Sequence, residues 1–122
     1  MGWFAAHGIF YFKLESGPQD RYTIWENVYL FEAPSAEEAL ASANAWAKEV
    51  EAGNLDSGFT ENGQPALLVF AGIRKLISVS HESAEGEVRS RDEITYSEFV
   101  VPDEASIERL VNGEDVQLTY VE

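Results

Sequence analysis

Residues 22–53, YTIWENVYLFEAPSAEEALASANAWAKEVEAG, contain the change of hydrophobic period that decides the fold. Up to Ala33 apolar and polar side chains alternate, which is typical of a half-buried strand, and we expect this strand to begin at Tyr22. After Pro34 the apolar residues recur every three or four positions, which is typical of an amphipathic helix. A strand that leads directly into a helix indicates a mixed α and β domain.

The helix is expected to run from Ala36 to Ala52. Ser35 is placed as its N-cap, Glu38 at the third helical position completes a capping box, and Gly53 is placed to end it. Its apolar stripe is mostly alanine, so the helix should lie close against an antiparallel sheet. The residues expected to contact that sheet are Leu40, Ala43, Trp46 and Ala47. If Trp46 is buried, Trp46→Ala should lower the free energy of unfolding by about 3 to 5 kcal/mol.

Another alternating run, from Trp3 to Glu15, precedes the turn-forming residues 16–21, so the first two strands are predicted to form a β-hairpin. Both of its faces are apolar. The first strand carries Phe4, Ala6, Phe10 and Phe12 on one face and Trp3, His7, Ile9 and Tyr11 on the other, and the second carries Trp25, Tyr29 and Phe31 opposite Ile24, Val28 and Leu30. Because one helix covers only one face, we expect the other to be covered by a second copy in a two-fold homodimer.

The remaining chain predicts two more strands, a short helix and a final strand. The strands are expected over Ala66–Val79 and Val88–Val101, joined by a turn at residues 82–86. The short helix should begin at Pro102-Asp103-Glu104, point Ile107, Leu110 and Val111 inward, and end at Asn112-Gly113 before a strand over Val116–Val121. The order ββαββαβ predicts one α+β domain over residues 1–122, with two layers and an antiparallel sheet of about five strands.

The composition restricts the classes of function. The 122 residues include 22 acidic and 8 basic ones, a formal charge of −14, and residues 82–122 hold −9 of it. Such a charge repels nucleic acids and anionic membrane surfaces. The chain has no cysteine, no secretory signal pattern at Met1-Gly2-Trp3-Phe4 and no apolar stretch near the roughly 20 residues of a membrane span. We therefore expect a cytoplasmic protein without a membrane segment.

Three parts of the sequence carry a resemblance to a known family. They are residues 3–6 (WFAA); residues 26–33 (ENVYLFEA) running into 35–39 (SAEEA); and residues 62–63 (NG), 70–73 (FAGI) and 85–91 (EGEVRSR). Over about residues 3 to 91 the chain is similar to the uncharacterised bacterial family called domain of unknown function 4288. The resemblance implies a strand entering an acidic, alanine-rich helix and a central hairpin. It implies no activity and no catalytic residues.

Histidine chemistry has two candidates. His7 lies among apolar residues of the first strand, where a histidine is usually packed and hydrogen-bonded and less often functional. His81 has Glu82, Glu85 and Glu87 nearby, yet their spacing matches no metal-binding motif and a solvated turn explains them better. No cofactor fingerprint occurs either, so we expect no metal and no cofactor.

Basic and aromatic residues supply the other candidates. A hairpin of the third and fourth strands would bring Arg74 and Lys75 near Arg89 and Arg91, forming a basic island suited to a carboxylate or phosphate. Ion pairing with neighbouring acids is the commoner role of such arginines. With Trp25 and Tyr29, the candidates for ligand or partner contact are His7, Trp25, Tyr29, Arg74, Arg89 and Arg91.

Three functional interpretations follow. The first is an acidic interaction module that binds a basic protein, for example an immunity-type inhibitor of a nuclease toxin. The second is a small-ligand binder or enzyme that uses the basic island with His7, Tyr29 or Tyr96. In the third, the acidity reflects only solubility or a salt-rich cytosol.

Overall fold

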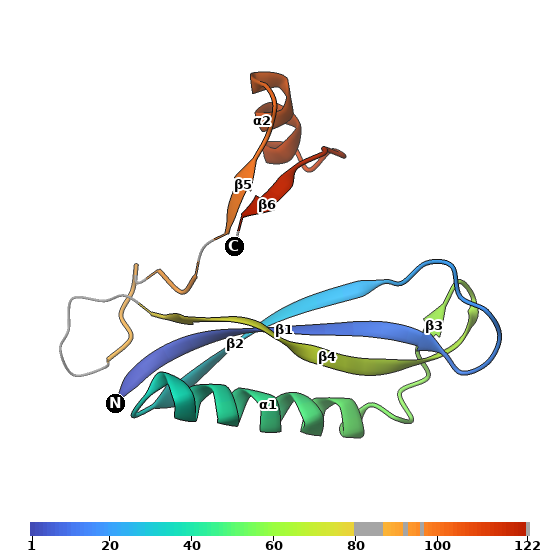
Figure 1. Cartoon of the computed structure of the whole chain (residues 1–122), viewed down its shortest axis with the longest axis horizontal. Helices are drawn as coiled ribbons and strands as arrows, with labels where there is room; N and C mark the ends of the chain where they lie inside the picture. Colours follow the sequence, from blue (N-terminus) through green and yellow to red (C-terminus); the bar gives the residue numbers. More distant parts are fainter. Residues whose placement is uncertain (80–86, 92, 96, 122) are drawn as a thin grey trace.

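The computed structural model describes residues 1–79, 87–91, 93–95 and 97–121. Mixed α and β elements make up the chain (Figure 1). In order, they are β1 (Gly2–Leu14), β2 (Ile24–Ala33), α1 (Ala36–Gly53), β3 (Thr60–Glu61), β4 (Gln64–Ser78), β5 (Glu98–Val100), α2 (Glu104–Val111) and β6 (Thr119–Val121). The expected sequence of elements is therefore corrected by one additional strand, β3, which pairs with the start of β4 through a turn at Asn62-Gly63.

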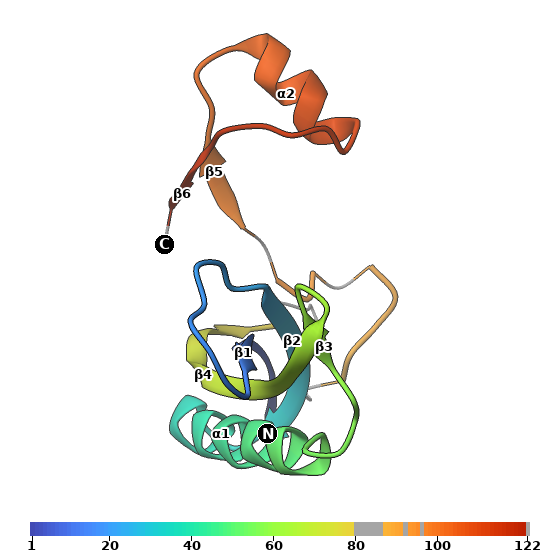
Figure 2. The same cartoon turned by 90° about the vertical axis from the view of Figure 1, so that its right-hand side faces the viewer.

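Strands β1 to β4 form a curled antiparallel sheet in the order β2-β1-β4-β3. The predicted hairpin is confirmed, with Ala6 of β1 opposite Tyr29 of β2. On its other side β1 pairs with β4, where Ala6 lies opposite Leu76. Helix α1 covers one face of this sheet, and the C-terminal elements lie on the opposite side (Figures 1 and 2).

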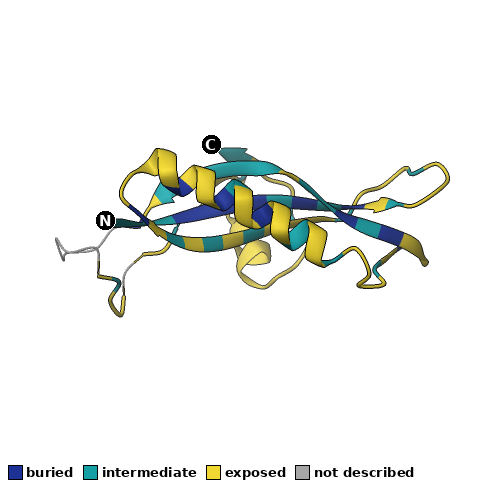
Figure 3. Ribbon diagram, turned by 90° about the horizontal axis from the view of Figure 1, so that it is seen from below, coloured by how far each residue is buried: buried dark blue, intermediate teal, exposed yellow. Residues whose placement is uncertain are grey.

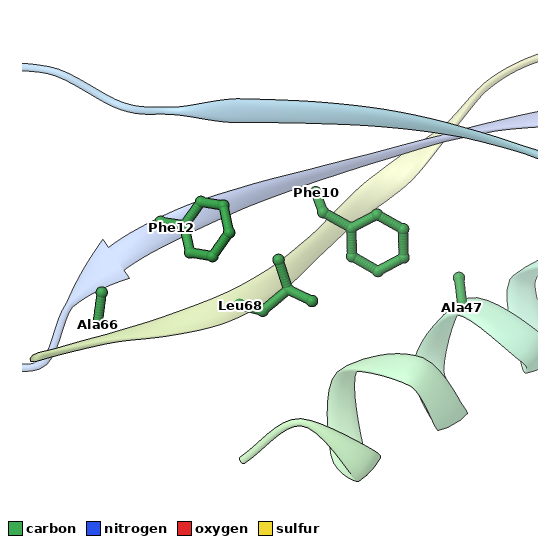
Figure 4. Packing of buried hydrophobic residues seen from close by; sticks show 5 residues of the cluster. All are labelled: Phe10, Phe12, Ala47, Ala66 and Leu68. Carbon is green, nitrogen blue, oxygen red and sulfur yellow. The ribbon is translucent and has the colours of Figure 1, made fainter. Parts of the chain in front are cut away.

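The core lies between α1 and the sheet. Its central cluster consists of Phe10, Phe12, Ala47, Ala66 and Leu68 (Figure 4). Buried positions follow the central strand and the side of α1 that faces it (Figure 3). The expected capping of α1 is present, because the Glu38 N–H donates to Ser35 Oγ at 3.2 Å. The helix extends to Gly53, one residue beyond the predicted end.

The contact residues of α1 differ in part from the prediction. Ala39, Ala43 and Ala47 are fully buried, whereas Leu40 is exposed and Trp46 keeps 44% of its surface exposed. The alanines repeat every four residues and bring the helix so close to the sheet that only small side chains fit beneath it. Leu40 and Trp46 are displaced to the flanks, where Trp46 meets the Tyr29 ring edge-on at 6.3 Å.

The predicted strand over Val88–Val101 is wrong in most of the part that the structure describes. Residues 87–91 form coil and a turn, and only Glu98–Val100 is a strand, which pairs with β6. Strand β4 finds its long antiparallel partner in β1, from Ala66 to Ser78, and Glu98–Val100 pairs with β6 and not with the second edge of β4, which among the described residues carries only β3. The turn expected at residues 82–86 lies outside the described residues.

The C-terminal elements β5, α2 and β6 form a separate unit, here called the C-terminal unit. The prediction that Ile107, Leu110 and Val111 point inward is wrong: all three are exposed, Val111 by 79%. Within the described part of the chain α2 packs against no strand, and it stands away from the sheet in Figure 2. The final strand is also shorter than the expected Val116–Val121. No helix of the described residues is long and apolar enough to cross a bilayer.

Candidate functional site

A polar network lies on the sheet face that α1 leaves uncovered, here called the open face. Its three central residues come from neighbouring strands: His7 from β1, Glu26 from β2 and Arg74 from β4. The register of β1 against β4 shifts between His7 and Gly8, so that Arg74 is an extra residue on β4. Such a bulge redirects side chains, and here the Arg74 guanidinium reaches across His7 to Glu26 on the far strand.

The Glu26 carboxylate is the centre of the network. Arg74 Nε donates to Oε2 at 2.7 Å and Arg74 Nη2 to Oε1 at 3.0 Å, while His7 Nδ1 lies 2.8 Å from Oε1. These bonds lower the pKa of Glu26 to about 2, chiefly through the Arg74 side chain and less through His7, against the opposing effect of burial. Glu26 is therefore a carboxylate at any ordinary pH, and His7 Nδ1 must be the donor in their bond.

The network continues into the C-terminal half of the chain. His7 Nε2 lies 2.8 Å from the Thr95 hydroxyl. The Arg74 guanidinium donates to the Tyr120 hydroxyl and stacks on the Tyr120 ring, with 4.2 Å between its central carbon and the ring centroid. Ser97 Oγ is 3.0 Å from the same hydroxyl. These contacts connect Thr95, Ser97 and strand β6 with the sheet.

The surroundings of Tyr120 favour the ionised form of its hydroxyl. Its pKa lies below the ordinary value, first because of the Ser97 hydrogen bond and then because of the hydrogen bond and positive charge of Arg74 and the charge of Lys75. Phe99 of β5 packs edge-on against the Tyr120 ring at 5.0 Å. Tyr120 is thus the joint between the C-terminal unit and the open face.

Glu26, His7 and Thr95 are arranged in the order of a catalytic triad. A carboxylate holds the imidazole through Nδ1, and the second ring nitrogen faces a hydroxyl, as in the triads of hydrolases. However, His7 is only 2% exposed and Glu26 shares its charge with Arg74. The same bonds also serve as a structural anchor for residue 95.

The outer edge of β2 is the second feature of interest. Among the strands that the structure describes, β2 pairs with β1 alone, so one edge of its ten residues carries no partner strand. The exposed apolar side chains on this strand are Ile24, Trp25, Val28 and Leu30, each 41 to 53% exposed. The strand contains no proline, lysine or arginine, the residues that commonly protect free edges.

The structure brings only some of the predicted site residues together. His7 and Arg74 meet through Glu26. Trp25 and Tyr29 lie on the face of α1, where Trp25 meets the Phe12 ring edge-on with 4.8 Å between ring centroids and Tyr29 packs against the core. Arg89 and Arg91 are exposed in coil and turn, and the hairpin that would have carried them to Arg74 is not formed in the described residues.

Sequence reasoning missed three members of the network: Glu26, Thr95 and Tyr120. Glu26 had a signal, because it is the acidic exception on an outward face otherwise formed by Ile24, Val28 and Leu30. Thr95 and Tyr120 had none, since their bonds depend on how the C-terminal half folds back. His81 and Tyr96, considered above, lie outside the described residues. Within the described ranges no three histidine or acidic side chains are grouped to hold a metal ion.

Residues 3–90 match the model of the family described as Domain of unknown function (DUF4288). The chain belongs to this family. The matched region includes His7, Glu26 and Arg74, whereas Thr95 and Tyr120 lie beyond it. No curated protein and no solved structure matches the chain.

Proposed function

We propose that this member of the DUF4288 family is an interaction module that binds a basic, extended segment of another protein along the free edge of β2. The long unprotected edge of this strand carries the proposal. A free edge offers a row of backbone donors and acceptors to an incoming strand, and alternate side chains provide the specificity. The exposed Ile24, Val28 and Leu30 are such alternate side chains on one face.

The charge of the chain supports a basic partner. The net charge of −14 attracts cationic proteins and speeds their association at low ionic strength. On β2 itself the exposed Glu32 adds to this field. A basic nuclease toxin held by an immunity-type inhibitor fits this chemistry. We place the interaction in the cytoplasm because the cysteine-free chain needs no oxidising compartment.

Residues 1–122 act as one unit in this proposal. The bonds from Arg74 and His7 to Tyr120 and Thr95 connect the family region with the C-terminal unit. By tying down Glu26 on β2, the same network fixes the middle of the binding strand. Preorganisation of this kind reduces the entropic cost of adding a strand.

A matched pair of leucines tests the proposal. Leu30 on β2 and Leu40 on α1 are both 41% exposed, so Leu30→Lys and Leu40→Lys make the same change at different surfaces. Basic proteins captured from cell extract at low salt should bind the Leu30→Lys variant at least about tenfold more weakly, and Leu40→Lys like the wild type. Binding should weaken with added salt.

Hydrogen exchange gives the second readout for this proposal. A captured partner, once purified, should slow exchange at the amides of β2 if it adds a strand there. Equal binding by the two leucine variants, or slowed exchange only outside β2, would contradict the proposal.

Acyl transfer is a second candidate function, favoured by the order Glu26, His7, Thr95 with 2.8 Å at each step. In this reaction the Thr95 hydroxyl would attack an ester carbonyl while His7 Nε2 takes its proton, and the alcohol of the ester would leave with that proton. Water would then hydrolyse the acyl-threonine, releasing the carboxylic acid and restoring the hydroxyl. Hydrolysis of p-nitrophenyl acetate measures it. The candidate requires a rate above buffer that Thr95→Val abolishes and that Thr119→Val, a change at the exposed first residue of β6, leaves intact. The burial of His7 places this candidate second.

A further inference from the structure

The C-terminal unit has too little core to account for its apolar side chains. In α2 only Ser106 is buried. The exposed large apolar side chains of this unit are Phe99, Val100, Ile107, Leu110, Val111 and Leu118. A two-stranded ribbon with a helix of eight residues is at best marginally stable in water when it buries so little. These side chains therefore need a cover that the unit does not contain.

The open face of the sheet also has apolar side chains that nothing in the described chain covers. Ile24, Val28 and Leu30 occupy alternate positions of β2 and project on the side opposite α1. The polar network, with Thr95 bonded to His7, lies over the adjoining β1, where Ala5 and His7 are buried. The uncovered apolar part of this face is thus a strip along β2.

One chain does not bring these two surfaces together. Tyr120 bonds the Arg74 guanidinium, which also reaches Glu26 in the middle of β2. Even so, the neighbouring Ile24, Val28 and Leu30 stay 41 to 53% exposed. Helix α2 contacts none of the described strands and stands clear of the sheet in both views (Figures 1 and 2). Each surface needs an apolar cover, and both belong to the same molecule.

We infer that two copies of the chain form a two-fold dimer in which α2 of each copy covers the β2 strip of the other. A two-fold axis repeats every contact, so one mode of association covers both surfaces in both copies. The exposed apolar side chains of the two copies would bury on the order of 1,000 Å² or more, at the lower end of stable interfaces. This goes beyond the proposed function, because the occupant is a second copy and the contacts are side chains of one face.

Charge determines the salt dependence of this dimer. Each copy carries −14, so the copies repel one another at low ionic strength. Screening by salt should strengthen the dimer, whereas it should weaken binding of a basic partner. The two proposals therefore respond to salt in opposite directions, and failure of one can be told from failure of the other.

Light scattering with matched variants is the first test. At high micromolar concentration the wild type should be dimeric, more completely at about 0.5 M than at about 0.05 M salt. Val111→Glu in α2 and Val28→Glu in β2 should each give a monomer with unchanged circular dichroism. Leu40→Glu, on the far face, should leave the dimer intact. A wild-type monomer at both salt concentrations overturns the inference.

Disulfide cross-linking tests whether α2 of one copy lies on β2 of the other. Since the chain has no native cysteine, only the engineered cysteines can react. A Val111→Cys variant mixed with a Val28→Cys variant should form a mixed disulfide between different chains under mild oxidation. If instead each variant links only to itself, the copies meet helix to helix or sheet to sheet, and the inference is overturned. Because the dimer and a basic partner would use the same side chains of β2, Val111→Glu should capture basic partners at least as well as the wild type.

Discussion

Helices α1 and α2 begin in the same way and lie in different surroundings. Each has an extended N-cap residue, Ser35 or Asp103, whose side chain accepts the backbone N–H of the third residue after it. Each is amphipathic. Yet α1 buries three alanines completely against the sheet, and α2 buries only Ser106. Local signals thus specify where a helix begins, whereas its packing depends on which strands the rest of the chain places beneath it.

Two regions follow from this contrast: the first is the sheet with α1, and the second is the C-terminal unit. The largest effect on stability is expected when a core leucine of the first region is truncated. Leu68 of β4 belongs to the core cluster and is 5% exposed. Leu68→Ala should cost about 2 to 5 kcal/mol, because it removes buried methyl groups and leaves a cavity. Urea unfolding followed by tryptophan fluorescence measures this cost. A loss below about 1 kcal/mol would mean that the core is not where the structure places it.

A smaller loss is expected at the joint between the two regions. Arg74→Ala leaves Glu26 and His7 without their shared cation and removes the bond to Tyr120. The expected cost is about 1 to 3 kcal/mol, moderated by the partial exposure of the pair. Hydrogen exchange should accelerate in β5, α2 and β6 more than in β1.

The exposed Arg91 provides the control for this joint. Arg91→Ala should leave both stability and the exchange pattern unchanged. Uniform acceleration throughout the chain with Arg74→Ala would show that Arg74 supports the sheet and does not specifically attach the C-terminal unit.

Much of the first region could be predicted from its sequence. The hairpin, the helix and β4 follow from alternation, from the cap at Ser35 and from continuous apolar runs, and their bounds differ by only a few residues from those observed. The alanines of α1 indicated a close approach to the sheet. They did not reveal that this approach expels Trp46 to the flank, because that depends on the distance between two layers.

The second region could not be predicted in the same way. Residues 88–101 have the alternation of a strand, but strand formation needs a partner, and in the described residues only Glu98–Val100 finds one, in β6 and not in β4. The same limit applies to the site. His7 and Arg74 could be identified singly, whereas their meeting at Glu26 depends on a bulge that no local motif announces.

The pH dependence of the free energy of unfolding should measure how much the Glu26 carboxylate contributes to stability. The pKa of Glu26 falls from 4.5 to about 2 on folding. Its stabilising contribution is therefore fully present above pH 4.5 and is lost as the pH falls from there toward 2. Allowing for solvent screening, it amounts to about 1 to 2 kcal/mol.

Urea midpoints at several pH values between about 6 and about 2 would measure this contribution in the wild type and Glu26→Gln. The wild type should be the more stable at pH 6, and the gap should narrow with acid. Glu32→Gln, on the same strand, controls for general charge effects. A gap that stays constant down to pH 2 would contradict the role of Glu26.

Trp46 tests how far the amphipathic pattern of α1 predicts energetics. Full burial would make Trp46→Ala cost about 3 to 5 kcal/mol. At 44% exposure, with one edge-on contact to Tyr29, about 1 kcal/mol is expected instead. Calorimetric melting with Trp46→Ala and Ala43→Leu distinguishes the two cases. The inserted leucine should be the more damaging, since the alanine is fully buried against the sheet.

The smallest effect on stability is expected for a leucine of the C-terminal unit, Leu110. Leu110 has the same side chain as Leu68, but it lies on the apolar side of α2 and is 41% exposed. Below the concentration at which copies associate, Leu110→Ala should change stability by less than about 0.5 kcal/mol, because no buried contact is lost and alanine favours the helix. Urea unfolding at about 1 μM, where a weak dimer dissociates, measures this monomer value. The same variant at high micromolar concentration should unfold more easily than the wild type, because there the leucine covers the sheet of a second copy. A loss of several kcal/mol already at low concentration would place Leu110 inside a core of its own chain, and the contrast between the two helices would disappear.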